Sequence, residues 1–226
     1  MVNPCDAADQ PRKATPEMRA WSSAELGRFI TFTELGRGGG VWRLLATTGM
    51  RRGELLGLRW ADIDLDAGRL TIRQTMTMVG DRPEVGSPKT SAGARRVSID
   101  ADTVTALLTW RRGQAAERLM MGGGWQGGHN LVVTEPDGSP VHPQVLTRRF
   151  QSITKRAGLP VVRLHDVRHS YATAALAAGV QVKTLSQRLG HADVAVTLRI
   201  YAHVLPGDDE AAAAIVAAAC QASVPA

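Results

Sequence analysis

Five side chains suited to phosphate chemistry are spread over three regions of the sequence. They are Arg51, His165 with Arg168, and His191 with Tyr201, which is one of only two tyrosines in 226 residues. An arginine can bind two phosphate oxygens through its planar guanidinium, and a histidine can transfer a proton near neutral pH. A phenol can attack phosphorus as a nucleophile. The set therefore suits the attack of a tyrosine on a phosphodiester.

Two of these side chains are three residues apart, namely His165 and Arg168. On a helix they would share a face and could reach one phosphate together. Arg51 is expected at the start of another helix, where the guanidinium and the helix N-terminus both favour a phosphate. Glu54, one turn later, would either hold Arg51 in place or improve the charge pattern of the first turn. By spacing alone, Arg52 is an equal candidate.

The phenol needs help to act as a nucleophile. Its pKa of about 10 leaves roughly one tyrosine in a thousand ionised at pH 7, a deficit of about 4 kcal/mol that a base and cationic groups must offset. Arginines would stabilise the charge that develops on the phosphoryl oxygens. The sequence has no P-loop and no carboxylate cluster of the two-metal nuclease kind. We therefore expect no cofactor and no metal, with the energy of the broken bond retained in a tyrosyl ester.

The elements that position these residues are read from the apolar periodicity, which predicts a mainly α-helical domain with one small antiparallel β-sheet, an α+β fold class. Helices are expected over 21–30, 41–48, 51–58, 101–120, 143–157, 165–178, 182–189, 193–203 and 209–219. The glycine-rich segment 36–40 is expected to end the first helix. Residues 69–78 alternate apolar with polar and predict a strand, with 96–99 as its partner; 131–134 is expected to be a short strand or an extended segment.

The composition bounds the class of partner. Lysine plus arginine number 27 against 21 acidic residues, which gives a net charge of +6 and a pI near 10. Such a balance favours a polyanion such as nucleic acid. Cys5 and Cys220 lie near opposite termini and suggest neither a disulfide framework nor a metal site, so a cytoplasmic location is expected. The longest apolar run, 211–220, is about half the roughly 20 residues of a membrane span, and neither a span nor export is expected.

Four motifs, taken in order, resemble the catalytic domain of the tyrosine recombinases, the phage integrase family. They are Thr-Gly-Met-Arg-Arg-Gly-Glu at 48–54, Leu-His-Asp-Val-Arg-His at 164–169, Leu-Gly-His at 189–191 and Ile-Tyr at 200–201. The resemblance covers 21–205 and implies the fold of that domain. The polar residues 1–20, with three prolines, are expected to be a linker or arm. Residues 206–226 are expected to be a C-terminal helix or tail and a candidate for subunit exchange.

The resemblance also implies a catalytic role for each residue. Arg51 and Arg168 would clamp the nonbridging oxygens of the scissile phosphate, and His191 would donate a hydrogen bond to it. His165 would assist proton transfer at the tyrosine. Tyr201 would attack the phosphate, leaving a 3′-phosphotyrosyl link and a free 5′-hydroxyl. The implied activity is site-specific DNA recombination, by integration or excision.

A sixth catalytic residue is implied by the same resemblance. The family has a lysine on a hairpin loop between the two arginine motifs, which acts as general acid on the leaving 5′-oxygen. Lys89 matches that place, before the expected strand at Arg96. Arg95 and Arg96 are close enough in sequence to be alternatives or backbone contacts.

The partners follow from the resemblance as well. Double-stranded DNA is the expected substrate, on which the family forms a homotetramer; accessory DNA-bending factors are compatible with this scheme. Without DNA a monomer is expected. The segment 209–219 would pack into a neighbouring subunit or, equally, fold back on its own domain. Integrases usually carry a helical core-binding domain before this one, and only the linker-like start of the chain stands in its place, so the chain alone could be inactive.

Three alternatives are set against the recombinase. His165 and His169 have the spacing of zinc metalloprotease ligands, but Asp166 follows where those enzymes have a glutamate. A type IB topoisomerase shares the tyrosine, arginines and lysine, whereas His165 and the Leu-Gly-His motif favour the recombinase. A truncated prophage remnant without recombinase activity is the third. For a recombinase, Arg168→Ala should remove several kcal/mol of transition-state stabilisation and leave the fold intact.

Overall fold

The computed structural model of the protein describes residues 19–80, 82–86, 93–204, 213–214, 216–218 and 220. Three predictions fall wholly or mostly outside these residues. They are the arm at 1–20, Lys89, and the C-terminal segment at 206–226.

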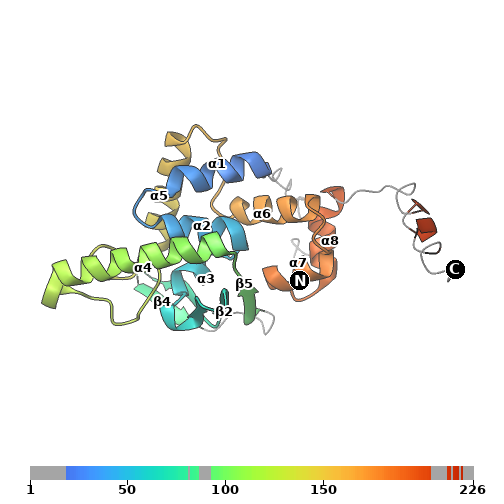
Figure 1. Ribbon diagram of the computed structural model, residues 1–226. Coiled ribbons are helices and arrows are strands. Elements are labelled where there is room, and N and C mark those ends of the chain that lie inside the picture. The colour runs from blue at the N-terminus through green and yellow to red at the C-terminus, as the bar shows by residue number, and fades with distance from the viewer. Residues whose placement is uncertain are drawn as a thin grey trace, which may run out of the picture.

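Helices make up most of the described chain, as the apolar periodicity predicts (Figure 1). They are α1 (Ser23–Thr33), α2 (Gly39–Thr48), α3 (Arg52–Gly57), α4 (Ala101–Met121), α5 (Pro143–Arg156), α6 (Asp166–Ala177), α7 (Val182–Leu189) and α8 (Val194–Tyr201). Local signals set several of these ends: Ser22 and Glu25 form a capping box at α1, and Asp193 caps α8. A single 3₁₀ turn, Ala202–Val204, follows α8. The helix predictions within the described residues are confirmed to within a few residues.

The β-structure differs from the single sheet that the sequence predicts, because it consists of two small antiparallel sheets. The first contains β1 (Ile63–Asp64), β2 (Arg69–Ile72) and β5 (Arg95–Ser98) in the order β1-β2-β5. Leu70 of β2 lies opposite Val97 of β5, so the predicted pairing of the strand that begins at residue 69 with the segment 96–99 is confirmed.

The second sheet pairs β3 (Thr75–Val79) with β4 (Arg82–Gly86). The predicted continuous strand at 69–78 is therefore wrong, since it is interrupted after Ile72 and its second half has a different partner. The sequence analysis missed β4 because its five residues include a proline and a glycine, both depleted in strands. The segment predicted to be extended at 131–134 forms only isolated β-bridges.

Glycines fix the packing of α2. Gly38 and Gly49 precede and follow the helix with φ of 75° and 62°, a left-handed conformation that favours glycine. The expected break at 36–40 therefore ends at Gly38, and Gly40 lies inside the helix. A Cβ on Gly40 would lie 2.5 Å from the carbonyl oxygen of Ala106 in α4. The two backbones thus approach too closely for any larger residue.

The buried apolar residues form two clusters. In the larger one, Trp21, Phe29, Trp42 and Phe150 pack together with ring centroids 5.2 to 6.3 Å apart. The smaller one lies among α6, α7 and α8, which group together at one side of the molecule (Figure 1). Its fully buried members are Ala172, Leu176, Leu185, Leu189 and Tyr201. Tyr201 therefore belongs to a small core formed by α6, α7 and α8, separate from the larger one.

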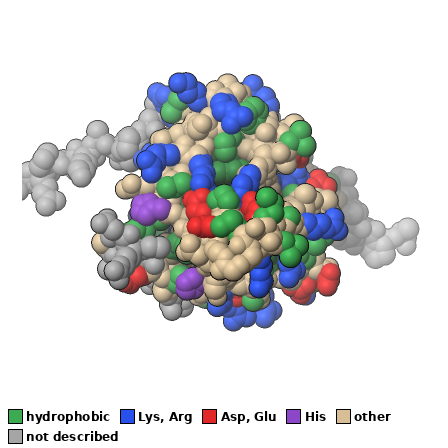
Figure 2. Space-filling model, turned by 90° about the vertical axis from the view of Figure 1, so that its left-hand side faces the viewer, with side chains coloured by type: hydrophobic (Ala, Val, Ile, Leu, Met, Phe, Trp, Pro, Cys, Tyr) green, Lys and Arg blue, Asp and Glu red, His purple; other side chains and the backbone are tan. Residues whose placement is uncertain are grey.

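The surface carries the positive charge of the chain in separate groups. Figure 2 shows Lys and Arg side chains over the top and the lower part of one face, with a small acidic group near its centre. In the described residues, no helix combines the length and the apolar character needed to cross a membrane.

Candidate active site

A buried carboxylate, Glu54, joins two arginines. It is 3% exposed and accepts the side chain of Arg51 at Oε1 and its backbone N–H at Oε2, both at 2.8 Å. Arg95, from β5, donates to both oxygens at 2.9 Å. Burial acts to raise the pKa of Glu54, but the hydrogen bonds and charges of Arg95 and Arg51 outweigh it and hold the pKa below its ordinary value. The sequence left open whether Glu54 holds Arg51 in place or improves the charge pattern of the first turn. In the structure, Glu54 holds Arg51.

Three successive carbonyl groups at the C-terminal end of α7 accept hydrogen bonds from three arginines. The pairs are Arg95 Nε with Arg188 O (2.6 Å), Arg168 Nη2 with Leu189 O (2.6 Å) and Arg51 Nη2 with Gly190 O (3.3 Å). The C-terminal end of a helix dipole is negative and favours cations. Gly190, with φ of 68°, ends the helix, and His191 follows directly. The end of α7 thus gathers two of the predicted arginines beside one of the predicted histidines.

Arg168 lies in the first turn of α6 and is only 3% exposed. Its Nη1 donates to the carbonyl oxygen of Gly49 at 2.8 Å, in addition to its bond with Leu189. Burial, and then the charge of Arg51, lowers the pKa of Arg168 to about 9, so the guanidinium stays charged at pH 7. The structure corrects the expectation that Arg168→Ala would spare the fold. The substitution leaves two interior carbonyl groups without their donor, a loss of about 1–3 kcal/mol for each group left unsatisfied.

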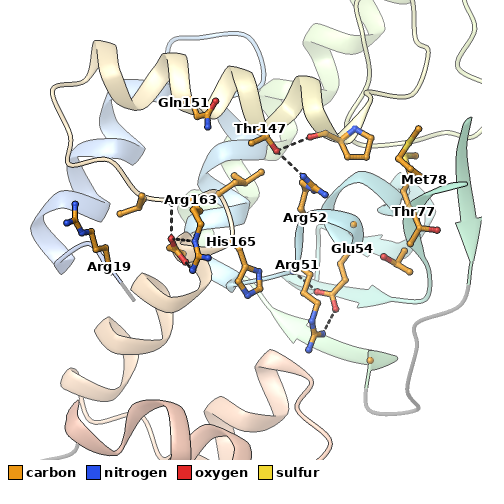
Figure 3. Close-up of a pocket in the computed structure, with 18 of the residues that line it drawn as sticks. Arg19, Arg51, Arg52, Glu54, Thr77, Met78, Thr147, Gln151, Arg163 and His165 are labelled. Atoms are coloured by element: carbon orange, nitrogen blue, oxygen red, sulfur yellow. Dashed lines mark hydrogen bonds and ion pairs between the residues drawn. The ribbon is translucent and has the colours of Figure 1, made fainter. Parts of the chain in front are cut away.

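An open cavity of about 1120 Å³ lies between α3, β3, α5 and the segment that precedes α6. The acidic side chains in its wall, Glu54 and Asp166, are each paired with an arginine (Figure 3). Its basic side chains and imidazole are those of Arg19, Arg51, Arg52, Arg163 and His165. The cavity therefore carries a positive charge that suits a polyanionic backbone.

His165 is the residue just before α6, and its exposed ring lies on the cavity side near Arg163 and Arg51 (Figure 3). Partial burial, and then the charge of Arg168, lowers the pKa of His165, so it is neutral at pH 7. The structure also separates the two candidate arginines. Arg52 Nη1 donates to Thr147 of α5 at 3.0 Å, whereas Arg51 is directed to the end of α7.

His191 is half-buried between α7 and α8. Its Nδ1 lies 2.8 Å from the hydroxyl of Thr197, which fixes the ring against α8. Burial, and then the charges of Arg168 and Arg51, lowers the pKa of His191 to about 4. The ring is therefore neutral at pH 7 and stands among positive charges, where an anion would be favourable.

Tyr201 is the last residue of α8 and is 2% exposed. Its phenolic oxygen lies 2.7 Å from Nδ1 of His169. Burial raises the pKa of Tyr201 to about 12, although the charge of Arg168 acts to lower it. The structure therefore brings together Arg51, His165, Arg168, His191 and Tyr201, with the phenol on the enclosed side and Arg51 and His165 in the cavity wall.

The family is decided by a match over most of the chain. The model of the phage integrase family matches residues 37–207, which include all five of these side chains. The chain belongs to the phage integrase family.

Known integrases and recombinases resemble the chain over most of its length. A tyrosine recombinase XerC-like protein of Caldanaerobacter subterraneus subsp. tengcongensis is 31% identical over 221 residues, covering 90% of this chain and 56% of that protein. The catalytic domain of bacteriophage HP1 integrase is 18% identical with a TM-score of 0.55, covering 87% of this chain and 94% of that domain. The Tn1549 transposon integrase, solved with transposon right end DNA, is 20% identical with a TM-score of 0.73, covering 94% and 69%. The chain spans about half the length of the curated relatives that it matches.

The candidate site contains one histidine that sequence reasoning did not place in it. His169 was considered only as a zinc ligand, yet its ring is the one against the Tyr201 hydroxyl. Its position four residues after His165 was a usable signal, because such residues lie on one helix face. Among the described residues, no group of three histidine, cysteine or acidic side chains could hold a metal ion. Lys89, the sixth residue implied for an integrase, lies outside the described residues and stays a prediction.

Acid is expected to destabilise the chain between about pH 7 and pH 4.5. The pKa of His191 is about 4 in the folded chain and about 6.5 when unfolded. The unfolded chain therefore binds more protons in this interval, and the free energy of unfolding falls as the pH falls. Urea unfolding at several pH values measures the effect. His191→Asn, which cannot titrate, should lose less stability than the unaltered chain, and an equal loss in both would contradict the pKa assigned to His191.

Proposed function

We propose that the chain is the catalytic part of a site-specific DNA recombinase that cleaves and rejoins strands through a covalent 3′-phosphotyrosyl intermediate. The observation that carries the proposal is the convergence of five side chains beside the C-terminal end of α7. They are two arginines (Arg51 and Arg168), two neutral histidines (His165 and His191) and one enclosed tyrosine (Tyr201). These groups supply charge stabilisation, hydrogen bonding and a nucleophile without a metal ion.

In this proposal the scissile phosphate enters beside Arg51 and His165 in the cavity wall. Arg51 and Arg168 exchange their carbonyl partners at the end of α7 for the nonbridging oxygens, which are better acceptors because they are charged. His191 donates a hydrogen bond to the same phosphate. Tyr201 attacks the phosphorus, and Lys89 protonates the departing 5′-oxygen. Since Tyr201 is enclosed in the free chain, the attack requires the site to open between its hydroxyl and the phosphate.

The relatives support the same conclusion. The Tn1549 integrase, with which the chain shares its fold, was solved with transposon DNA. We propose double-stranded DNA as the partner of this chain too, consistent with its net charge of +6 and the basic cavity. A homotetramer on DNA and a monomer without DNA complete the proposal. The C-terminal segment is the candidate for the contact between subunits.

Capture of the covalent intermediate tests the proposal. The chain is incubated with a pool of duplexes of randomised sequence that carry a nick, so that cleavage releases a short strand and traps the tyrosyl ester. Adducts that survive denaturation are isolated and their DNA is sequenced. We expect one recovered sequence class, attached through its 3′-phosphate to Tyr201. Recovery of no adduct from folded protein contradicts the proposal, and relaxation of supercoiled plasmid without sequence preference would indicate a topoisomerase instead.

A further inference from the structure

The hydroxyl of Tyr201 has one hydrogen-bond partner in the described part of the chain, the imidazole of His169. The Tyr201 oxygen and Nδ1 of His169 are 2.7 Å apart, and the two ring centroids are 5.8 Å apart. His169 lies on α6 and Tyr201 ends α8, so this bond links the two helices at the nucleophile itself. The sequence-based scheme has no role for His169.

His165, the neighbouring histidine, faces the cavity and not Tyr201. His165 packs edge-to-face on His169 with ring centroids 5.2 Å apart. It is exposed and lines the cavity, where Arg51 also lies. Within the described residues, no hydrogen bond joins His165 to Tyr201. One helical turn therefore directs one imidazole toward the phosphate side and the other toward the nucleophile.

The surroundings of His169 favour its neutral form. Burial, then His165, lowers its pKa, and Arg168 and Arg163 act in the same direction, whereas Asp166 acts in the opposite one. His191, from the end of α7, and Tyr201 face the same space. A neutral imidazole has one nitrogen without a proton, which can accept a hydrogen bond and then the proton itself.

We propose that His169 is the catalytic base of this site and that its Nδ1 removes the phenolic proton of Tyr201. This inference rests on the proposed strand-cleavage function. As the bond from the Tyr201 oxygen to phosphorus forms, the bond from phosphorus to the 5′-oxygen breaks, and the phenolic proton moves to Nδ1 of His169. A separate donor, Lys89 in the proposed function, supplies the proton that the 5′-oxygen takes up. On rejoining, both protons return, so one cycle leaves His169 neutral again.

The tautomer of His169 tests the inference without DNA. Nitrogen NMR of ¹⁵N-histidine-labelled protein near pH 7.5 distinguishes the two ring nitrogens, and His169→Asn identifies the signals that belong to His169. We expect Nδ1 to be unprotonated and hydrogen-bonded, with the proton on Nε2. Tyr201→Phe should move the Nδ1 resonance toward that of a free acceptor. A protonated Nδ1 overturns the inference, because that nitrogen could not accept the phenolic proton.

The rate of cleavage provides the second test, on the duplex recovered by adduct capture. One version of the duplex carries sulfur in place of the bridging 5′-oxygen, because a thiolate leaves without a proton. We expect His169→Asn to slow adduct formation by about 10²–10⁴-fold on both versions, the range for loss of a general base. Lys89→Ala should slow adduct formation on the oxygen version of the duplex only. His129→Asn, at an exposed histidine outside the site, is the matched control and should react at the unaltered rate.

Added imidazole distinguishes a role of His169 in proton transfer from a role in packing. His169→Ala should gain cleavage rate in proportion to the imidazole concentration, which a purely structural role would not produce. The inference is overturned if His169→Asn reacts within about twofold of the unaltered chain on the sulfur version, below the range for base catalysis. If the unaltered chain forms no adduct with any duplex, the proposed function fails instead, and the NMR result still decides whether His169 accepts from Tyr201.

Discussion

Tyr201→Phe is expected to abolish covalent attachment of DNA, with adduct formation reduced by more than about 10⁴-fold, as for other nucleophile replacements. The change removes only the oxygen that attacks phosphorus in the proposed function. Removing the hydroxyl also removes its hydrogen bond to His169, at a cost of about 1 kcal/mol in the free energy of unfolding. The side chain is 2% exposed and packs in the small core of α6, α7 and α8, which phenylalanine fills equally well. The fold should therefore persist while the chemistry stops.

Tyr171→Phe is the matched control, because Tyr171 is the only other tyrosine of the chain. Its hydroxyl accepts a hydrogen bond from Arg188 at 2.7 Å and is not part of the proposed chemistry. Denaturing gel electrophoresis with a labelled nicked duplex measures both variants, and circular dichroism checks that they are folded. We expect a full adduct yield from Tyr171→Phe and none from Tyr201→Phe. An adduct that persists in folded Tyr201→Phe would assign the nucleophile to another residue.

Glu54→Gln is expected to lower the free energy of unfolding by about 3–5 kcal/mol, the cost of breaking a buried ion pair by removing one partner. Glu54 is 3% exposed, and the side chain of Arg95 is 7% exposed. The amide keeps the shape of the side chain but cannot neutralise the two guanidiniums of Arg51 and Arg95. Urea unfolding near pH 7.5 measures the loss.

The same substitution should also slow cleavage. Arg51 loses the carboxylate that fixes both its side chain and its backbone N–H. A misplacement of about 1 Å at a reacting group can cost about 10²-fold in rate. We therefore expect the rate of adduct formation to fall by about that factor, measured below the temperature at which Glu54→Gln unfolds.

Asp62→Asn is the matched control for Glu54→Gln. Asp62 is also a buried carboxylate that pairs with two arginines, Arg59 and Arg73, and it lies outside the site. Its replacement should lower stability and leave the cleavage rate of the folded protein unchanged. If Glu54→Gln behaves in the same way, Glu54 supports the fold and does not position Arg51.

Much of the fold could be predicted because helix signals are local. Apolar residues at helical spacing, the cap at Ser22 and the terminating glycines at 49 and 190 act within a few residues of the chain. The division into two sheets was not predictable in the same way. The partner of β3 is a short strand with a proline and a glycine, whose pairing is a tertiary contact and not a local preference.

The sequence by itself determined the residue types, their order and the family resemblance, because these depend on the chain alone. It could not show that Glu54 also binds Arg95, 41 residues away, or that three arginines share the carbonyl groups at the end of α7. Nor could the residue types alone decide whether His165 or His169 contacts the tyrosine, because the two imidazoles are one helical turn apart and chemically identical. Only the packing of α6 against α8 decided that His169 meets the phenol of Tyr201. The physical reason is that burial, hydrogen bonding and charge at a site are set by neighbours in space, and those neighbours come from distant parts of the chain.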